Sequence, residues 1–274
     1  MSSILTNNSA MVALQTLKSI NGNLAKTQSE ISTGKSIASA KDNSAVWAIS
    51  KVMESDVSGF KAISSSLALG QSTVAVATAG AEQITNLLNS MKEKVVAATG
   101  ENVDNAKITA DVDEMKNQIT SIINAAQFNG ANLLNTAGGD ITILSSLDRD
   151  AAGVVTASNI TVASVDFQAG LDLTTIDVST SAAADTSLAA METLIQAAVD
   201  GAAALGASQT RIEQQSSFVS KLTDAMKSGI GAMVDADMEE ASARLQALQV
   251  QQQLGVQSLS IANQGAQSIL SLFR

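Results

Sequence analysis

The feature that most constrains this chain is a seam of apolar and small residues that repeats in alternating steps of three and four from Phe60 to Val95. This spacing places the seam on one face of an α-helix, which at 1.5 Å per residue would be about 55 Å long. The seam consists of Phe60, Ile63, Leu67, Gly70, Val74, Ala77, Ala81, Ile84, Leu88, Met91 and Val95. Such a helix needs partner helices along its whole length, as in a coiled coil. The 274 residues contain no Pro, which fits long uninterrupted helices.

Two further segments repeat this spacing and can supply the partners. The first opens near Asp104, a favourable N-cap, and stops before the turn signal Asn129-Gly130. The second begins near Asp185 and continues through Met226. The side chains expected in the rod core are Phe60, Ile63, Leu67, Val74, Ile84, Leu88, Met91, Ile108, Val112, Met115, Ile119, Ile122, Leu188, Met191, Ile195 and Leu205. The predicted fold is mainly α, a long antiparallel helical hairpin that forms a coiled-coil rod.

The two ends of the chain carry the same spacing, and each has a second apolar stripe beside the first. We expect the N-terminal helix to stop at Gly34 and to pair with the last helix as an antiparallel hairpin. Pairing uses one stripe on each helix, so the other stripe must be buried by other molecules. The predicted subunit interface consists of Leu14, Leu17, Ile20, Leu24, Ile31, Leu245, Leu248, Leu254, Leu259, Ile261, Ile269, Leu270, Leu272 and Phe273.

Residues 136–184 differ from the rest because they are rich in Thr, Val, Ile, Ser and Gly. Short β-prone runs at Ile141–Leu144, Asn159–Val165 and Thr174–Val178 predict hairpins or irregular loops. The many Ser and Thr residues of 142–187 are either acceptors for O-linked sugars or ordinary polar loop residues, and the sequence leaves both readings open.

Composition removes several classes of function. The chain has no His and no Cys, so it lacks the usual general base and any thiol chemistry. Its net charge of −10 makes nucleic acid and anionic membrane poor partners. We find no unbroken run of 18 apolar residues and no basic start typical of a cleavable signal peptide, so we predict neither a membrane span nor such a signal.

Two local patterns have a functional and a structural interpretation. The carboxylates of Asp235, Asp237, Glu239 and Glu240 could hold a cation, but they fit better as the acidic start of a helix. Residues 229–231 read Gly-Ile-Gly, which predicts a hinge rather than a phosphate loop because no Lys-Ser or Lys-Thr follows. We therefore predict no enzyme activity, no metal and no cofactor.

Four motifs, taken in order, resemble those of bacterial flagellins over essentially the whole chain. They are ISTGKSIASAKDNSAVWAIS at residues 31–50, QFNGANLL at 127–134, LGASQTRIE at 205–213, and the closing helix that runs from VDADMEEASARL to SILSLFR at 234–274. The short centre is most similar to the small flagellins of alphaproteobacteria. The chain departs from the family where Val46 and Trp47 follow the linker and where Gly265-Ala266-Gln267 replaces a common Pro.

The resemblance implies a domain plan and a set of partners. Residues 1–33 and 235–274 would form the inner domain D0, residues 34–45 a linker, residues 46–135 and 185–234 the rod domain D1, and residues 136–184 a β-rich insert, with no large outer domains. The chain would be secreted and would assemble with other flagellin copies into the extracellular filament used for swimming. Expected further partners are hook-junction and filament-cap proteins, the flagellar type III export apparatus and an export chaperone.

The resemblance also predicts an altered receptor patch. In many flagellins the stretch that contacts the vertebrate innate receptor has Arg and then Arg-Glu-Leu, whereas this chain has Ser90, Lys92, Glu93 and Lys94. Lysine cannot replace the bidentate guanidinium of arginine. Two other functions stay open here: a hook–filament junction protein with similar terminal helices, and a chemoreceptor signalling rod.

Overall fold

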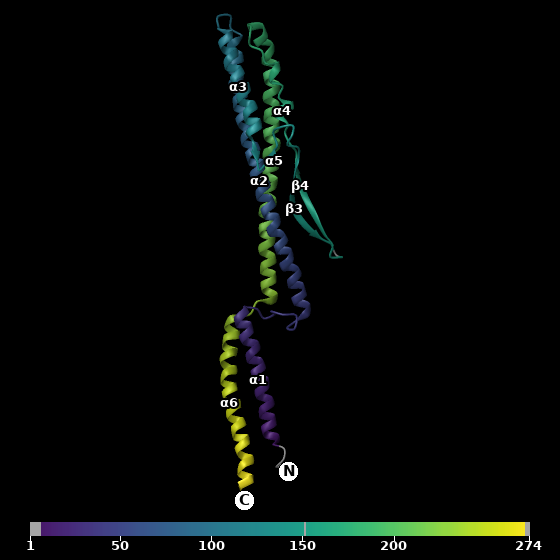
Figure 1. Ribbon diagram of the computed structural model, residues 1–274, viewed down its shortest axis with the longest axis vertical. Coiled ribbons are helices and arrows are strands. Elements are labelled where there is room, and N and C mark those ends of the chain that lie inside the picture. The colour runs from purple at the N-terminus through teal and green to yellow at the C-terminus, as the bar shows by residue number, and fades with distance from the viewer. Residues whose placement is uncertain (1–6, 151, 272–274) are drawn as a thin grey trace. The chain divides into compact units, whose positions relative to one another are not determined.

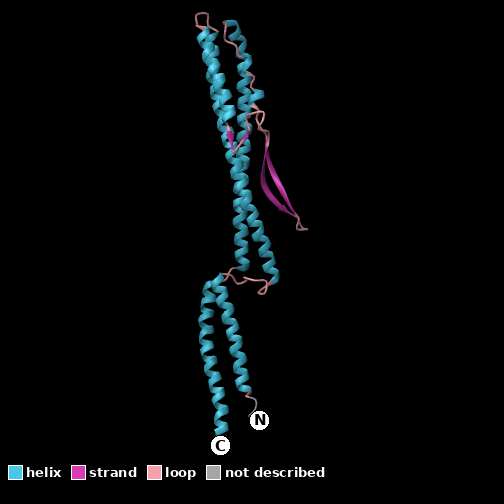
Figure 2. Ribbon diagram, viewed as in Figure 1, coloured by secondary structure: helices cyan, strands magenta, loops and turns pink. Residues whose placement is uncertain are grey.

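The structure is a computed structural model that describes residues 7–150 and 152–271 and divides into two compact units. One unit combines the two ends of the chain, up to Ser55 and from Ala225 onward, and the other is Asp56–Asp224. The helices are α1 (Asn8–Thr33), α2 (Ser44–Ala98), α3 (Asn105–Ala125), α4 (Phe167–Gly170), α5 (Ser181–Val234) and α6 (Met238–Ser271), and the strands are β1 (Gln127–Phe128), β2 (Ala131–Asn132), β3 (Ile141–Arg149) and β4 (Val155–Val162). Figure 1 labels these elements, and Figure 2 shows how far helix predominates.

Within Asp56–Asp224, α2 runs beside α3 and α5. At 55 residues, α2 is about 82 Å long. Every seam position predicted on α2, from Phe60 to Val95, is buried. Ion pairs cross from α2 to both neighbours, through Lys92–Glu192 and Lys94–Asp111. The predicted helical rod is therefore confirmed.

The predicted start and end of α3 are also confirmed. The side chain of Asp104 caps the helix by accepting a hydrogen bond from the backbone N–H of Lys107. After the helix ends, Asn129 and Gly130 have φ values of 51° and 84° and connect β1 to β2. Two successive left-handed residues are typical of a type I′ hairpin turn, which Asn-Gly favours.

The insert is one antiparallel hairpin of β3 and β4, with an irregular register between Leu144 and Ser146. The first predicted β-run lies in β3, and residues 159–162 of the second lie in β4. The third run, Thr174–Val178, follows the irregular-loop alternative, because residues 173–175 form a 3₁₀ turn and residues 176–178 have no regular secondary structure. Asp172 accepts a hydrogen bond from the backbone N–H of Thr174 and so stabilises that turn. Helix α5 begins at Ser181, a few residues earlier than predicted.

The β3–β4 hairpin packs on α2 where α2 has glycines. A Cβ on Gly70 would lie 2.3 Å from Cδ1 of Ile143, and a Cβ on Gly59 would lie 2.7 Å from Cδ1 of Leu147. Only a residue without a side chain permits such close approach. The guanidinium of Arg149 pairs with the carboxylate of Asp56 and fixes the end of β3 to the same helix.

The predicted hinge at residues 229–231 is wrong, because α5 continues without a break to Val234. Each helical glycine costs about 1 kcal/mol relative to alanine, which is not enough to interrupt a helix supported by packing. The terminal methyl group of Met53 lies against Gly229, where a Cβ would be 3.5 Å from Cε of Met53. The break comes instead at Asp235 and Ala236, before α6.

Helix α5 changes one expectation about hydropathy. It contains an 18-residue window with a mean hydropathy of 1.3, so by length and composition alone it could cross a membrane. We searched the sequence for unbroken runs of apolar residues. That search missed this window because the alanine-rich stretches of α5 are interrupted by single polar residues. Core helices of other proteins pass the same composition test, and Met191, Leu194 and Leu205 of α5 are buried in the bundle.

Candidate subunit interface

Helices α1 and α6 form an antiparallel pair whose register is set by polar contacts. The side chain of Asn7 caps α1 by accepting a bond from the N–H of Ala10, and its amide donates to the carbonyl of Ala262 on α6 at 2.9 Å. Further along, the Gln252 amide donates to Oδ1 of Asn21 at 2.8 Å. These contacts confirm the predicted pairing of the two end helices.

The pair packs closely where α6 has a glycine. A Cβ on Gly255 would lie 3.1 Å from Cδ1 of Leu17 and 3.8 Å from Cδ1 of Ile20. Of the predicted interface residues, Leu248 is buried, and those half-buried are Leu17, Ile20, Leu24, Ile31, Leu245 and Leu259. One stripe of each helix is therefore covered by the other helix.

A second apolar stripe stays uncovered on both helices. The predicted residues Leu14, Leu254 and Ile261 are 58%, 57% and 64% exposed. Their exposed apolar neighbours are Met11, Val12, Val250 and Val256, of which Val12 and Val256 were not singled out from the sequence. Both lie just outside the alternating spacing used to define the stripes. Ile269 and Leu270 lie on α6, and Leu272 and Phe273 lie outside the described residues.

The two linkers that join this pair to the longer helices are bonded to each other. Gly34 ends α1 with a left-handed φ of 68°, as predicted. Lys35 and Asp235 form an antiparallel bridge, in which the N–H of Ser36 donates to the carbonyl of Val234 at 2.8 Å and the N–H of Ala236 donates to the carbonyl of Gly34 at 2.9 Å.

A carboxylate clasp strengthens this junction. Glu54 on α2 accepts hydrogen bonds from Lys51 at 2.6 Å and from Lys35 at 3.3 Å. These bonds, the one from Lys51 first, lower the pKa of Glu54 below its ordinary value. The acidic run that follows Asp235 starts a helix, because the side chain of Asp237 accepts bonds from the N–H groups of Glu239 and Glu240. Among the described residues, no group of His, Cys, Asp or Glu is arranged to hold a metal.

The predicted rod-core residues fall into two sets. Those that are buried are Phe60, Ile63, Leu67, Val74, Ile84, Leu88, Met91, Val112, Ile119, Met191 and Leu205. Those that are half-buried beside the seam are Ile108, Met115, Ile122, Leu188 and Ile195. Beside Ile122, Leu188 and Ile195, the buried positions are their neighbours Ile123, Ser187 and Leu194, which are 4%, 2% and 6% exposed.

The altered receptor patch lies on the surface of α2. Ser90 and Glu93 are exposed. The ammonium group of Lys92 is 2.5 Å from the carboxylate of Glu192 on α5, and that of Lys94 is 2.8 Å from Asp111 on α3. Both lysines are thus engaged within the chain.

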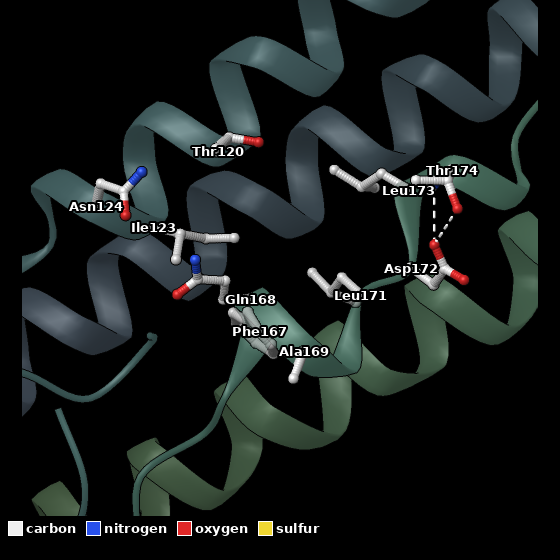
Figure 3. A pocket seen from close by; sticks show the side chains of 10 residues that line it. All are labelled: Thr120, Ile123, Asn124, Phe167, Gln168, Ala169, Leu171, Asp172, Leu173 and Thr174. Atoms are coloured by element: carbon white, nitrogen blue, oxygen red, sulfur yellow. Dashed lines mark hydrogen bonds between the residues drawn. The ribbon is translucent and has the colours of Figure 1, made fainter. Parts of the chain in front are cut away.

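A cavity of about 310 Å³ lies between α3 and residues 167–174, shown in Figure 3. Its apolar side chains include Ile123, Phe167 and Leu171, which are nearly fully buried. Its carboxylate, Asp172, accepts bonds from the backbone and hydroxyl of Thr174. The cavity is best explained as the seam where the segment around α4 packs on α3, since its lining offers no nucleophile–base pair.

An exposed apolar stripe on paired terminal helices is a surface of the kind found on subunits that self-associate. Comparison with known protein families identifies the family of this chain. Residues 4–138 match the bacterial flagellin N-terminal helical region, and residues 188–273 match the bacterial flagellin C-terminal helical region. The chain belongs to the bacterial flagellin family.

Two similar proteins are flagellins of alphaproteobacteria. It is 43% identical to flagellin FljM of Caulobacter vibrioides, over 100% of this chain and 99% of the relative. It is 42% identical to a flagellin of Brucella melitensis, over 100% of both chains. The chain is also similar in structure to a Bacillus cereus flagellin known from a crystal structure. The match covers 55% of this chain and 86% of the Bacillus chain, with a TM-score of 0.49 and 23% sequence identity.

The chain is therefore a structural subunit of the bacterial flagellar filament. It is exported and assembles outside the cell with other flagellin copies into the filament used for motility. Flagellins are structural proteins rather than enzymes. The family matches favour the filament subunit over the hook–filament junction protein.

Proposed function

We propose that copies of this chain pack against one another in the filament core through the exposed stripe of the α1–α6 pair, which thereby becomes buried. The observation that carries this is the exposure of Leu14, Leu254 and Ile261 on helices that are already paired. Each leucine or isoleucine that becomes fully buried contributes about 1.5–3 kcal/mol. The half-buried Leu17, Ile20, Leu24, Ile31, Leu245 and Leu259 would complete their burial there. We expect Ile269, Leu270, Leu272 and Phe273 to be buried in the same interface.

This proposal assigns roles to the parts of the chain. Residues 1–33 and 235–274 form the assembly domain D0, and residues 34–45 form the linker. Residues 46–135 and 185–234 form the rod domain D1, which carries the insert at 136–184. The hook-junction and cap proteins would contact the filament ends, and the flagellar type III export apparatus with a chaperone would deliver the chain unassembled. Coupling of folding to docking is the physical reason that an unassembled subunit needs such handling.

A seeded assembly experiment tests the proposed interface. Monomers of Leu254→Asp and Ile261→Asp are added to short wild-type filament seeds, and growth is followed by negative-stain electron microscopy. We expect each change to raise the concentration needed for growth by at least tenfold, because an unpaired charge would be buried. The matched control is Gln253→Asp, next to Leu254 on the same helix. Growth of all three variants at the wild-type concentration would contradict the proposal.

We also propose that this flagellin is a weak agonist of the vertebrate innate receptor for flagellin. Support comes from Ser90, Lys92 and Lys94, which offer no guanidinium fork, and from the ion pairs that already occupy both lysines. A receptor-reporter cell assay tests this, with the triple change Ser90→Arg, Lys92→Arg and Lys94→Leu expected to raise the response. A half-maximal response of the natural chain equal to that of an enteric flagellin would refute the proposal.

A further inference from the structure

The methionines of this chain differ sharply in how far they are open to solvent. Among the residues that the structure describes, Met11 on α1 is 63% exposed and Met238 at the start of α6 is 43% exposed. Met91 and Met191 in the rod are fully buried. The half-buried methionines are Met53, Met115, Met226 and Met233. The thioether of Met11 is therefore the one that a dissolved oxidant reaches most readily.

Met11 lies on the uncovered stripe of α1. It precedes Leu14 by three residues, which places both side chains on the same face of the helix. Leu14 is 58% exposed. Leu17, which packs on Gly255 of α6, lies six residues after Met11, about 120° around the helix axis. Helix α6 therefore does not cover Met11.

We propose that Met11 is an oxidation site through which hydroperoxides control assembly of the chain. The sulfur lone pair attacks one oxygen of the peroxide, the O–O bond breaks, and water leaves when the oxidant is hydrogen peroxide. The sulfur loses two electrons and the peroxide is reduced. The product has a polar sulfoxide in place of an apolar thioether, and such a group disrupts an apolar interface. Oxidised Met11 would therefore weaken the docking of α1 into the filament.

The inference rests on the proposed burial of the α1–α6 stripe between copies. If neighbouring copies cover that stripe, the thioether of Met11 is shielded once its chain has been assembled. Oxidation would then act on chains that have not yet docked and would spare the filament already built. Burial of the sulfoxide without a hydrogen-bond partner opposes docking of the oxidised chains.

Met238 provides an exposed methionine outside the stripe. It precedes Leu254 by 16 residues, which places the two side chains about 160° apart around α6. Oxidation of Met238 should therefore leave the stripe apolar. The comparison of Met11 with Met238 separates a specific effect of the stripe from a general effect of oxidation.

Seeded growth of peroxide-treated chains tests the site. Monomers are treated with hydrogen peroxide, freed of it with catalase, and added to wild-type filament seeds, and each chain is compared with its own untreated sample. For the natural chain we expect the concentration needed for growth to rise about fivefold or more. Met11→Leu should lose this response because leucine has no sulfur, whereas Met238→Leu should keep it. Tandem mass spectrometry, which separates Met11 from Met1, should show Met11 oxidised and Met91 intact.

Repair of the sulfoxide gives a second readout. Methionine sulfoxide reductases for both epimers, with dithiothreitol as the reductant, should restore growth of the oxidised natural chain. An equal loss of growth in the natural and Met11→Leu chains would overturn the inference. Unchanged growth of a natural chain whose Met11 is oxidised would also overturn it. Neither result touches the test with Leu254→Asp and Ile261→Asp, which decides the proposed function on other residues.

Discussion

At the scale of single residues, glycines decide how closely the parts of this flagellin approach. Gly70 receives Ile143 of the hairpin, Gly255 receives Leu17 of α1, and Gly201 receives the ring of Phe167, where a Cβ would lie 2.7 Å from Cε1. The sequence shows Gly70 as an interruption in a seam of larger residues. It did not reveal that the neighbour is a β-hairpin rather than a helix, since that contact joins residues far apart in the chain.

Gly70→Ala should destabilise the hairpin contact. The added methyl group would lie 2.3 Å from Cδ1 and 2.7 Å from Cγ1 of Ile143, so the side chain and strand must move. We expect a loss of about 1–3 kcal/mol in the free energy of unfolding, measured by urea denaturation.

The matched control for this change is Gly206→Ala on α5. A Cβ there meets nothing within 4 Å, so alanine should stabilise the helix by about 0.5–1 kcal/mol. The two substitutions should therefore change the free energy of unfolding in opposite directions. A Gly70→Ala chain as stable as the Gly206→Ala chain would show that Ile143 does not need the glycine.

At the scale of helices and strands, periodicity predicted which segments are helical but not their precise buried face. On α5 the seam runs through Ser187 and Leu194 rather than Leu188 and Ile195. A stripe of apolar residues is wider than one line, and the arrangement of α2 and the segment around α4 decides which edge is buried. Ser187 was overlooked because it is polar, although its hydroxyl is satisfied by bonding to the backbone of Asp177.

The clasp at Glu54 should make the stability of the linker depend on pH. Its pKa is lowered in the folded chain, so its contribution is present above the ordinary value of about 4.3 and is lost as the pH falls through the folded value. Glu54→Gln should lower the melting temperature by about 1–2 °C at pH 7, a size typical of exposed ion pairs.

The same comparison at a pH below the folded pKa of Glu54 serves as the internal control, because the carboxyl is then protonated in both states and the difference should vanish. Circular dichroism melts of both chains across this range give the measurement. A difference that persists unchanged at acid pH would assign the effect to packing rather than to charge.

At the scale of the whole molecule, composition set residues 136–184 apart as the insert, whereas the division of the helices into terminal and rod parts came from the resemblance to flagellins. The interface could be predicted only in outline. The face of α6 that α1 covers depends on the register set by Asn7, Asn21 and Gln252, and these polar contacts have no signature in hydrophobic periodicity.

Acid should dissociate filaments of this chain. The pKa values of Asp42, Glu54 and Asp177 are lowered by hydrogen bonds from Ser39, from Lys51 and Lys35, and from Ser179 respectively. Carboxyls of this kind favour the folded state above their ordinary pKa values, and that preference is lost as the pH falls through the folded ones. Light scattering should therefore fall to the monomer level by about pH 2–3. Scattering that stays at its neutral value there would show that carboxylates do not hold the filament.

The burial of the stripe on the α1–α6 pair can be measured directly with a single introduced thiol, because the natural chain has none. In a Leu254→Cys chain, the rate of maleimide labelling is compared between free monomers and filaments grown on wild-type seeds. Leu254 is 57% exposed in the single chain, so the monomer should react readily. If neighbouring copies cover the stripe, labelling in filaments should slow by at least tenfold. Equal rates in monomer and filament would show that the stripe remains open to water, and the account of the core interface would be wrong.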